Sequence, residues 1–97
     1  MLRHVVLFTW SDDADAGRRA TTVAALATLP DTVGGTLAFA VGPDAGLRPG
    51  NAHTALVADF PDVEAWRRYA EHPTHLAVIA EHVTPYVATR TAVQYEL

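Results

Sequence analysis

Short apolar segments alternate along the chain with segments rich in polar residues, Gly and Pro, and this pattern predicts four strands. The first apolar segment is rich in β-branched and aromatic residues and ends at Ser11, Asp12 and Asp13, which favour turns and helix caps. The later segments show the period-two alternation of strands. The four strands are expected at residues 2–10, 36–41, 53–60 and 87–97. Residues 42–51 contain three Gly and two Pro, so we expect a long mobile loop there.

Two helical regions are expected between these strands. In residues 13–29, four small apolar side chains recur at helical spacing, which predicts an amphipathic helix of about four turns. These side chains are Ala16, Ala20, Val23 and Ala27, and Leu26 lies beside them. Pro30 and the glycines Gly34 and Gly35 are expected to end this helix.

The second helical region contains a proline near its centre. Asp62 is expected to cap a helix that runs from Val63 to about His72. Pro73 must interrupt the hydrogen-bond ladder, and Thr74 is expected to cap a second segment that continues through Val83. We therefore expect two consecutive helices joined by a kink.

The order β-α-β-β-α-β predicts one α+β domain over residues 1–97 with the ferredoxin-like fold, in which two helices cover one face of a four-stranded antiparallel sheet. The first strand is apolar on both sides, with Val6 and Phe8 on one and Val5 and Leu7 on the other. Such strands are typical of sheets buried on both faces. We therefore expect a second copy of the chain to cover the bare face, giving a homodimer with its sheets face to face.

The composition excludes several classes of chemistry. The chain has no Cys, and its seven basic residues are all Arg, which excludes disulfides, thiolate chemistry, Schiff bases on lysine and a P-loop lysine. The formal net charge is −4 and the Arg residues are scattered, so we expect no nucleic-acid or membrane partner. No apolar run approaches the roughly 18 residues that span a bilayer, and no export signal is visible, so we expect a cytoplasmic protein.

A Tyr–His segment is the densest group of polar residues. Trp66 and Tyr69 lie three apart on one helix, and the kink at Pro73 allows His75 to approach the same side. Near a helix N-terminus, His75 is expected to stay neutral and to suit a general base, while the Tyr69 hydroxyl can donate to a carbonyl or enolate oxygen. The alternative is that these residues only satisfy backbone groups exposed by the proline.

Further residues are candidates for the same pocket. His4 lies in the first strand and shares a face with Phe8, and Thr54 lies on a strand expected beside it. The expected ligand contacts are Thr54, Trp66, His72 and Phe8. His72 and His75 have the spacing of metal ligands, but the proline between them breaks the register and no third ligand is placed by sequence. We therefore expect neither a metal nor another cofactor.

Three blocks of the sequence resemble the stress-responsive A/B-barrel (Dabb) family, and the similarity extends over essentially the whole chain. They are the opening residues 4–8, Asp59-Phe60 with the capped helix that follows, and Tyr-Ala-Glu-His-Pro-Thr-His at residues 69–75. The resemblance implies a dimeric α+β barrel.

The resemblance also implies roles for individual residues. One plant member of the family performs a C2–C7 aldol cyclisation of a polyketide thioester without a metal or organic cofactor. Its catalytic Tyr and His correspond to Tyr69 and His75, and a supporting pocket His corresponds to His4. A second pocket His corresponds to Thr54, and His53, displaced by one position, is expected to point to the opposite face.

Four functions remain open at this point. The leading hypothesis is a homodimeric Dabb-domain protein with one apolar pocket per subunit, between sheet and helices, for a small apolar or aromatic ligand. The second is a cofactor-independent polyketide cyclase or lyase with His75 as base, Tyr69 polarising a carbonyl and His4 orienting. The others are a purely structural or stress-protective dimer whose pocket is filled by side chains, and a cofactor-free monooxygenase with the same barrel architecture.

Overall fold

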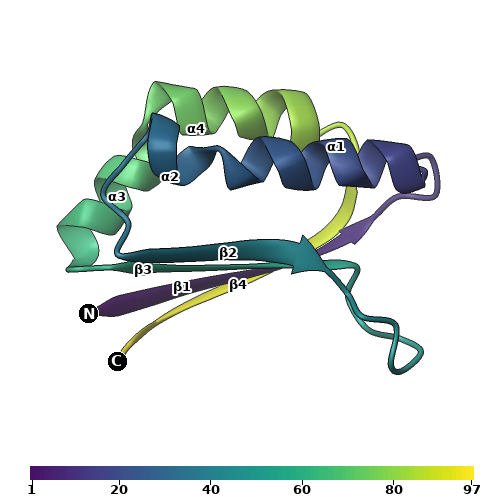
Figure 1. Ribbon diagram of the computed structural model, residues 1–97, viewed down its shortest axis with the longest axis horizontal. Coiled ribbons are helices and arrows are strands. Elements are labelled where there is room, and N and C mark those ends of the chain that lie inside the picture. Colours follow the sequence, from purple (N-terminus) through teal and green to yellow (C-terminus); the bar gives the residue numbers. More distant parts are fainter.

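The computed structural model describes residues 1–97 as helices packed on one face of a four-stranded antiparallel sheet (Figure 1). The sheet has the strand order β2-β3-β1-β4. In chain order the elements are β1 (Leu2–Trp10), α1 (Ala16–Ala27), α2 (Leu29–Thr32), β2 (Ala38–Pro43), β3 (Thr54–Phe60), α3 (Val63–Glu71), α4 (Pro73–Val78), the π-helix η1 (Ile79–Val83) and β4 (Val87–Glu96). The predicted ferredoxin-like α+β fold is confirmed, and none of the helices has the length and apolar composition needed to cross a membrane.

The central strand β1 determines which residues face the helices. His4 pairs with Ala58 of β3 and with Gln94 of β4, whereas Val5 pairs with Val57 and Val93. Paired residues of antiparallel strands point to the same face, and successive residues point to opposite faces. His4 is buried and Leu7 is exposed, so the face that carries His4 is packed under the helices and the face that carries Val5 is the outer face.

Helix α1 buries a different side from the one predicted. Asp15 caps the helix by accepting a hydrogen bond from the backbone N–H of Arg18. The buried residues of the helix are Thr22 and Leu26, whereas Ala16 and Ala20 are exposed. The predicted stripe of Ala16, Ala20, Val23 and Ala27 is wrong as the core-facing side, because the helix instead buries the side with Leu26, whose side chain is larger than that of alanine.

Pro30 does not simply end the first helical region. It lies in the first turn of the short helix α2, where its missing N–H has no helical partner to lose. Gly34 and Gly35 end this segment with φ values of 80° and 84°, a left-handed conformation that glycine adopts without steric cost.

The kink between α3 and α4 is confirmed, but its capping residue was predicted wrongly. Asp62 caps α3 as expected, accepting from Ala65 N–H. His72, not Thr74, caps α4: its backbone is extended with ψ 134°, and its Nδ1 accepts from the backbone N–H of Thr74 at 3.1 Å. The extended conformation is the one that a following proline favours, so the cap lies one residue before Pro73.

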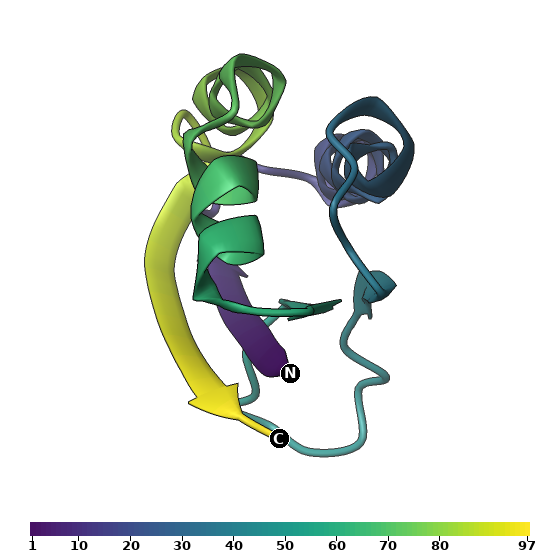
Figure 2. The same cartoon turned by 90° about the vertical axis from the view of Figure 1, so that its left-hand side faces the viewer.

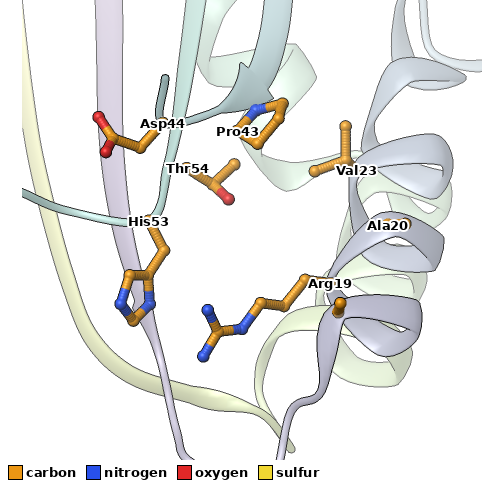
Figure 3. A pocket seen from close by; sticks show the side chains of 8 residues that line it. Arg19, Ala20, Val23, Pro43, Asp44, His53 and Thr54 are labelled. Carbon is orange, nitrogen blue, oxygen red and sulfur yellow. The ribbon is translucent and has the colours of Figure 1, made fainter. Parts of the chain in front are cut away.

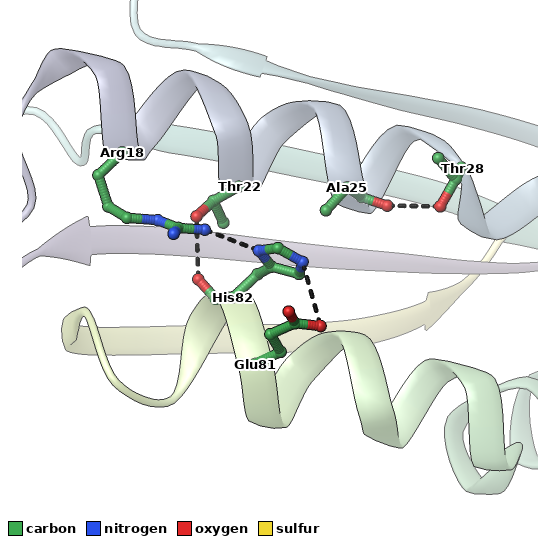
Figure 4. A network of polar contacts seen from close by, with 6 residues as sticks. All are labelled: Arg18, Thr22, Ala25, Thr28, Glu81 and His82. Atoms are coloured by element: carbon green, nitrogen blue, oxygen red, sulfur yellow. Dashed lines mark hydrogen bonds and ion pairs between the residues drawn. The ribbon is translucent and has the colours of Figure 1, made fainter.

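The π-helical turn η1 is joined to α1 by polar contacts (Figure 4). The backbone N–H of Thr84 donates to Ile79 O, five residues earlier. The hydroxyl of Thr22, which is 1% exposed, donates to the carbonyl oxygen of His82 at 2.9 Å, and an Arg18 Nη2 lies 2.7 Å from His82 Nδ1. These contacts join α1 and η1, which lie side by side on the same face of the sheet.

The helices lie on one face of the sheet only (Figure 2), and the outer face carries exposed apolar side chains. Leu7 is 41% exposed and Val93 is 54% exposed, and Val5 and Val57 lie beside them. The prediction that the sheet is apolar on both faces is therefore confirmed. At one end of this face Arg3 donates two hydrogen bonds to Asp59, at 2.8 and 2.9 Å, and this contact lowers the pKa of the Asp59 carboxyl.

Candidate active site

Tyr69 and His75 lie against each other across the kink between α3 and α4. Their ring centroids are 4.6 Å apart, at an interplanar angle of 47°. Tyr69 is 2% exposed and also packs on Phe60 of β3, with the ring centroids 5.1 Å apart. The turn at His72 and Pro73 brings the first turn of α4 back beside the last turn of α3, so the expected meeting of Tyr69 and His75 is confirmed.

The hydrogen bond of His75 determines which ring nitrogen carries the proton. Nδ1 of His75 lies 3.0 Å from the carbonyl oxygen of Ala70. A carbonyl oxygen can only accept, so Nδ1 donates and Nε2 of the neutral ring has a free lone pair. Burial lowers the pKa of His75, the bond to Ala70 opposes this shift, and the charges of Arg90 and His72 add to it. The neutral base is therefore favoured as predicted, but by burial rather than by the helix N-terminus.

Tyr69 has the opposite chemical character. Burial raises the pKa of its hydroxyl to about 12, because the phenolate would be poorly solvated. No hydrogen bond within the chain contributes to this shift. The hydroxyl therefore stays protonated near neutral pH and is a donor without an internal partner.

His4 supplies a second donor from β1. Its Nδ1 lies 2.8 Å from Nε2 of Gln94, and because an amide –NH₂ can only donate, Nε2 of the neutral ring carries the hydrogen. Burial, followed by the charges of Arg90 and His75, lowers the pKa of His4 to about 4. The His4 ring also faces Trp66, with centroids 6.1 Å apart. Gln94 was not anticipated, because its contact depends on the β1–β4 register.

A cavity of about 180 Å³ between sheet and helices joins these side chains. Its polar lining consists of His4, Tyr69, His75 and Arg90, and Phe8 and Trp66 line it as expected. Most of the remaining wall is aliphatic, from Val6, Leu26, Leu56, Leu76 and Ile79. Arg90 was missed because the sequence alone does not show which side of β4 faces the helices; its even spacing from Gln94 was the available signal.

Two expected ligand contacts lie elsewhere. The hydroxyl of Thr54 accepts a hydrogen bond from Trp10 Nε1 at 2.9 Å, and Trp10 stacks on Phe8 with centroids 5.0 Å apart. Thr54 therefore lies beyond this stack and outside the Tyr69–His75 cavity. His72 also lies outside, because it turns toward the first turn of α4 to cap it. The expectation that Thr54 and His72 line this cavity is wrong.

A larger cavity of about 520 Å³ lies between α1 and the adjoining ends of β2 and β3 (Figure 3). Thr54 and His53 both line it, together with Arg19 of α1. The expectation that His53 points away from Thr54 is wrong, because His53 precedes the first residue of β3, where strand alternation does not apply. Its Nδ1 accepts from the backbone N–H of Trp10 at 2.9 Å. This cavity has no tyrosine and a single histidine, and its other ionisable side chains are Arg19 and Asp44, so the Tyr–His pair belongs to the smaller cavity.

The five histidines do not form a metal centre. No group of three or more His, Cys, Asp or Glu side chains lies close enough together to hold a metal ion. His72 and His75 each use Nδ1 in a bond to the chain, to Thr74 and Ala70 respectively.

Solved structures with this fold come from bacteria and plants. A dimeric ferredoxin-like protein of unknown function from Thermobifida fusca is 36% identical, with a TM-score of 0.90 and coverage of 99% of this chain and 90% of that one. A Dabb family protein from Mesorhizobium loti is 22% identical, with a TM-score of 0.84 and coverage of 99% and 95%. A hydroxynitrile lyase from Passiflora edulis is 17% identical, with a TM-score of 0.85 and coverage of 99% and 92%. The last two likenesses show the shared fold alone.

The sequence itself identifies the family. No curated protein matches the chain significantly. The model of the stress responsive A/B barrel domain matches residues 2–97, which is nearly the whole chain and includes the strands and the Tyr–His segment described above. The chain therefore belongs to the stress responsive A/B barrel domain (Dabb) family.

Proposed function

We propose that this protein is a homodimeric, cofactor-independent enzyme of the lyase or cyclase type, which moves a proton on a small apolar or aromatic substrate in the Tyr69–His75 cavity. One observation carries the proposal: the ring of His75, whose Nε2 lone pair is free, and the ring of Tyr69, whose hydroxyl has no internal partner, have centroids 4.6 Å apart and line the same largely apolar cavity. A neutral base next to a neutral acid is the arrangement that general acid–base catalysis requires.

The roles follow from the hydrogen positions. In the cyclisation direction, His75 Nε2 removes a proton from a carbon next to a carbonyl, and the resulting carbanion attacks a second carbonyl carbon. Tyr69 donates a hydrogen bond to the oxygen that becomes the alkoxide, and His4 Nε2–H is a second donor in the same cavity. The proton on His75 then passes to the alkoxide. In the lyase direction the same groups act in reverse, and a C–C bond breaks.

Two further observations support this class of reaction. A hydroxynitrile lyase has the same fold, which agrees with lyase chemistry on this scaffold. The cavity volume of about 180 Å³ argues against the alternative of a pocket completely filled by side chains.

The homodimer is supported by the outer face of the sheet. Exposed Leu7, Val93 and Tyr95 form an apolar surface there, and a protein 36% identical to this chain is described as dimeric. Burying such surface against a second copy removes it from water. The helices, with the cavity that they help to line, lie on the other face of the sheet (Figure 2).

The test uses two probes that carry one aromatic ring, mandelonitrile and 4-hydroxy-4-phenyl-2-butanone. Cleavage of either releases benzaldehyde, which is followed by absorbance. We expect the wild-type chain to cleave at least one probe faster than buffer, and Tyr69→Phe and His75→Ala each to reduce the rate by about 10²- to 10⁴-fold.

The matched controls are Tyr86→Phe and His53→Ala, which change the same residue types outside the cavity. They are expected to retain the wild-type rate. Failure to cleave both probes, or equal rates for wild type, Tyr69→Phe and His75→Ala, would contradict the proposal.

A further inference from the structure

One side chain of the cavity has no part in the proposed proton transfer. Arg90 of β4 lines the cavity and is the only lining residue with a permanent charge. In the β1–β4 ladder it is paired with Phe8, which also lines the cavity. Since paired residues share a face of the sheet, Arg90 extends on the helix side, beside the aromatic ring of Phe8.

No carboxylate of the chain neutralises Arg90. The ion pairs of the structure use other groups, such as Arg3 with Asp59 and Arg67 with Glu64. The other titratable side chains that line the cavity are Tyr69 and the neutral rings of His4 and His75, and the charge of Arg90 helps to lower the pKa of both histidines, after the larger effect of burial. The cavity therefore has a positive group at its wall, donors and a neutral base inside, and no negative group.

We propose that Arg90 binds the carboxylate of the ligand, so that the substrates of this site are small monocarboxylic acids whose single ring or short chain fills the apolar part of the cavity. The inference rests on the proposed function for the position of the site and adds the class of substrate. The planar guanidinium offers paired N–H donors that match the two oxygens of a carboxylate.

The size of the cavity restricts the rest of the ligand. A volume of about 180 Å³ is similar to the cavity of about 150 Å³ that accepts benzene in an apolar protein core. One aromatic ring therefore fits in the cavity that Phe8 and Trp66 help to line, whereas a nucleotide does not. The ring of the ligand makes the apolar contacts. Its carboxylate binds Arg90 and so orients the ligand toward β4.

The test compares benzoate with benzamide, which has nearly the same shape and no charge. Isothermal titration calorimetry gives the affinities, and the NMR signal of the Trp66 indole N–H reports whether the ligand is in this cavity. We expect wild type to bind benzoate about three- to tenfold more tightly than benzamide, a modest factor because Arg90 is exposed to solvent. Arg90→Gln should remove this preference while leaving benzamide binding unchanged.

Two variants control for folding and for overall charge. Arg90→Lys keeps the charge and should retain part of the preference. Arg48→Gln removes the same charge from the exposed loop after β2 and should bind both ligands like wild type. Equal affinity of wild type for the two ligands, or an unchanged preference in Arg90→Gln, would overturn the role of Arg90 without affecting the acid–base site. If neither ligand shifts the Trp66 signal, the cavity itself is not a binding site, and the proposed function fails with it.

Discussion

At the scale of single residues, burial shifts the pKa values of Tyr69 and His75 in opposite directions. It raises the pKa of the Tyr69 hydroxyl to about 12 and lowers that of His75, because in each case the charged form loses solvation. Both groups are therefore neutral over a wide pH range, one as a donor and the other as an acceptor. No ion pair or metal is needed to keep them in these states.

The pH dependence of turnover follows from these shifts. The proposed proton transfer requires neutral His75, whose pKa lies below its ordinary value of 6.5, and protonated Tyr69, whose pKa is about 12. We expect kcat/KM to be constant from about pH 7 to 10 and to fall only below pH 6.5 as His75 gains a proton. The measurement is a pH–rate profile with a cleaved probe. An acidic limb centred above pH 7 would contradict the assignment of His75 as a buried base.

The lowered pKa of His4 leads to a separate prediction about stability. Its pKa is about 4 in the fold and near 6.5 in the unfolded chain, so between these values the unfolded chain binds more protons. The free energy of unfolding is therefore expected to fall as the pH decreases from 6.5 toward 4, by at most about 1.4 kcal/mol per pH unit for this group. Urea titrations across this range measure the effect. His4→Phe should have a shallower dependence than wild type.

At the scale of secondary-structure elements, the local signals predicted most elements and missed details that depend on packing. Asp62 as a cap and the interruption at Pro73 follow from short-range chemistry, and both are present. The buried side of α1 does not follow from spacing alone, because Leu26 and Thr22 find partners in the core and in η1. Likewise, the hydrogen-bond partner of His4 is Gln94, which lies ninety residues later in the chain and so could not be predicted from local sequence.

The contact between α1 and η1 can be tested at Thr22. Its buried hydroxyl satisfies the carbonyl oxygen of His82. Thr22→Val keeps the shape and removes the donor, so we expect a loss of about 1–3 kcal/mol in the free energy of unfolding. Thr22→Ser keeps the hydroxyl and should lose less, although it removes a methyl group. Chemical denaturation of both variants measures the difference, and an equal loss in the two would show that the hydrogen bond is unimportant.

At the scale of the whole molecule, the two faces of the sheet differ in burial and in the residues they carry. The helix face holds the core and the candidate site, and the outer face carries uncovered apolar side chains. Two-sided apolar strands indicated this division from the sequence, and the topology of the sheet agrees with it. The sizes and positions of the two cavities were not predictable, because they depend on how Phe8, Trp10 and the helices pack together.

The homodimer can be tested by placing a charge on the outer face. Val93→Glu would bury a carboxylate in the proposed interface, which is costly without a partner charge. We expect the wild-type chain to be a dimer and Val93→Glu to move toward the monomer of 10.4 kDa, measured by size-exclusion chromatography with light scattering. Ala24→Glu, on the exposed side of α1, is the matched control and should remain dimeric. A monomeric wild type would contradict the dimer.

The kink at Pro73 has a consequence for how this protein can diverge. Tyr69 and His75 are brought together by seven consecutive residues, so their geometry is determined locally, whereas Arg90 reaches the cavity from β4, an edge strand. Under the proposed function, substitutions in β4 would therefore change which ligands the cavity accepts while leaving the Tyr69–His75 pair unchanged. Close homologues can then share one reaction and differ in substrate, with the difference concentrated at position 90.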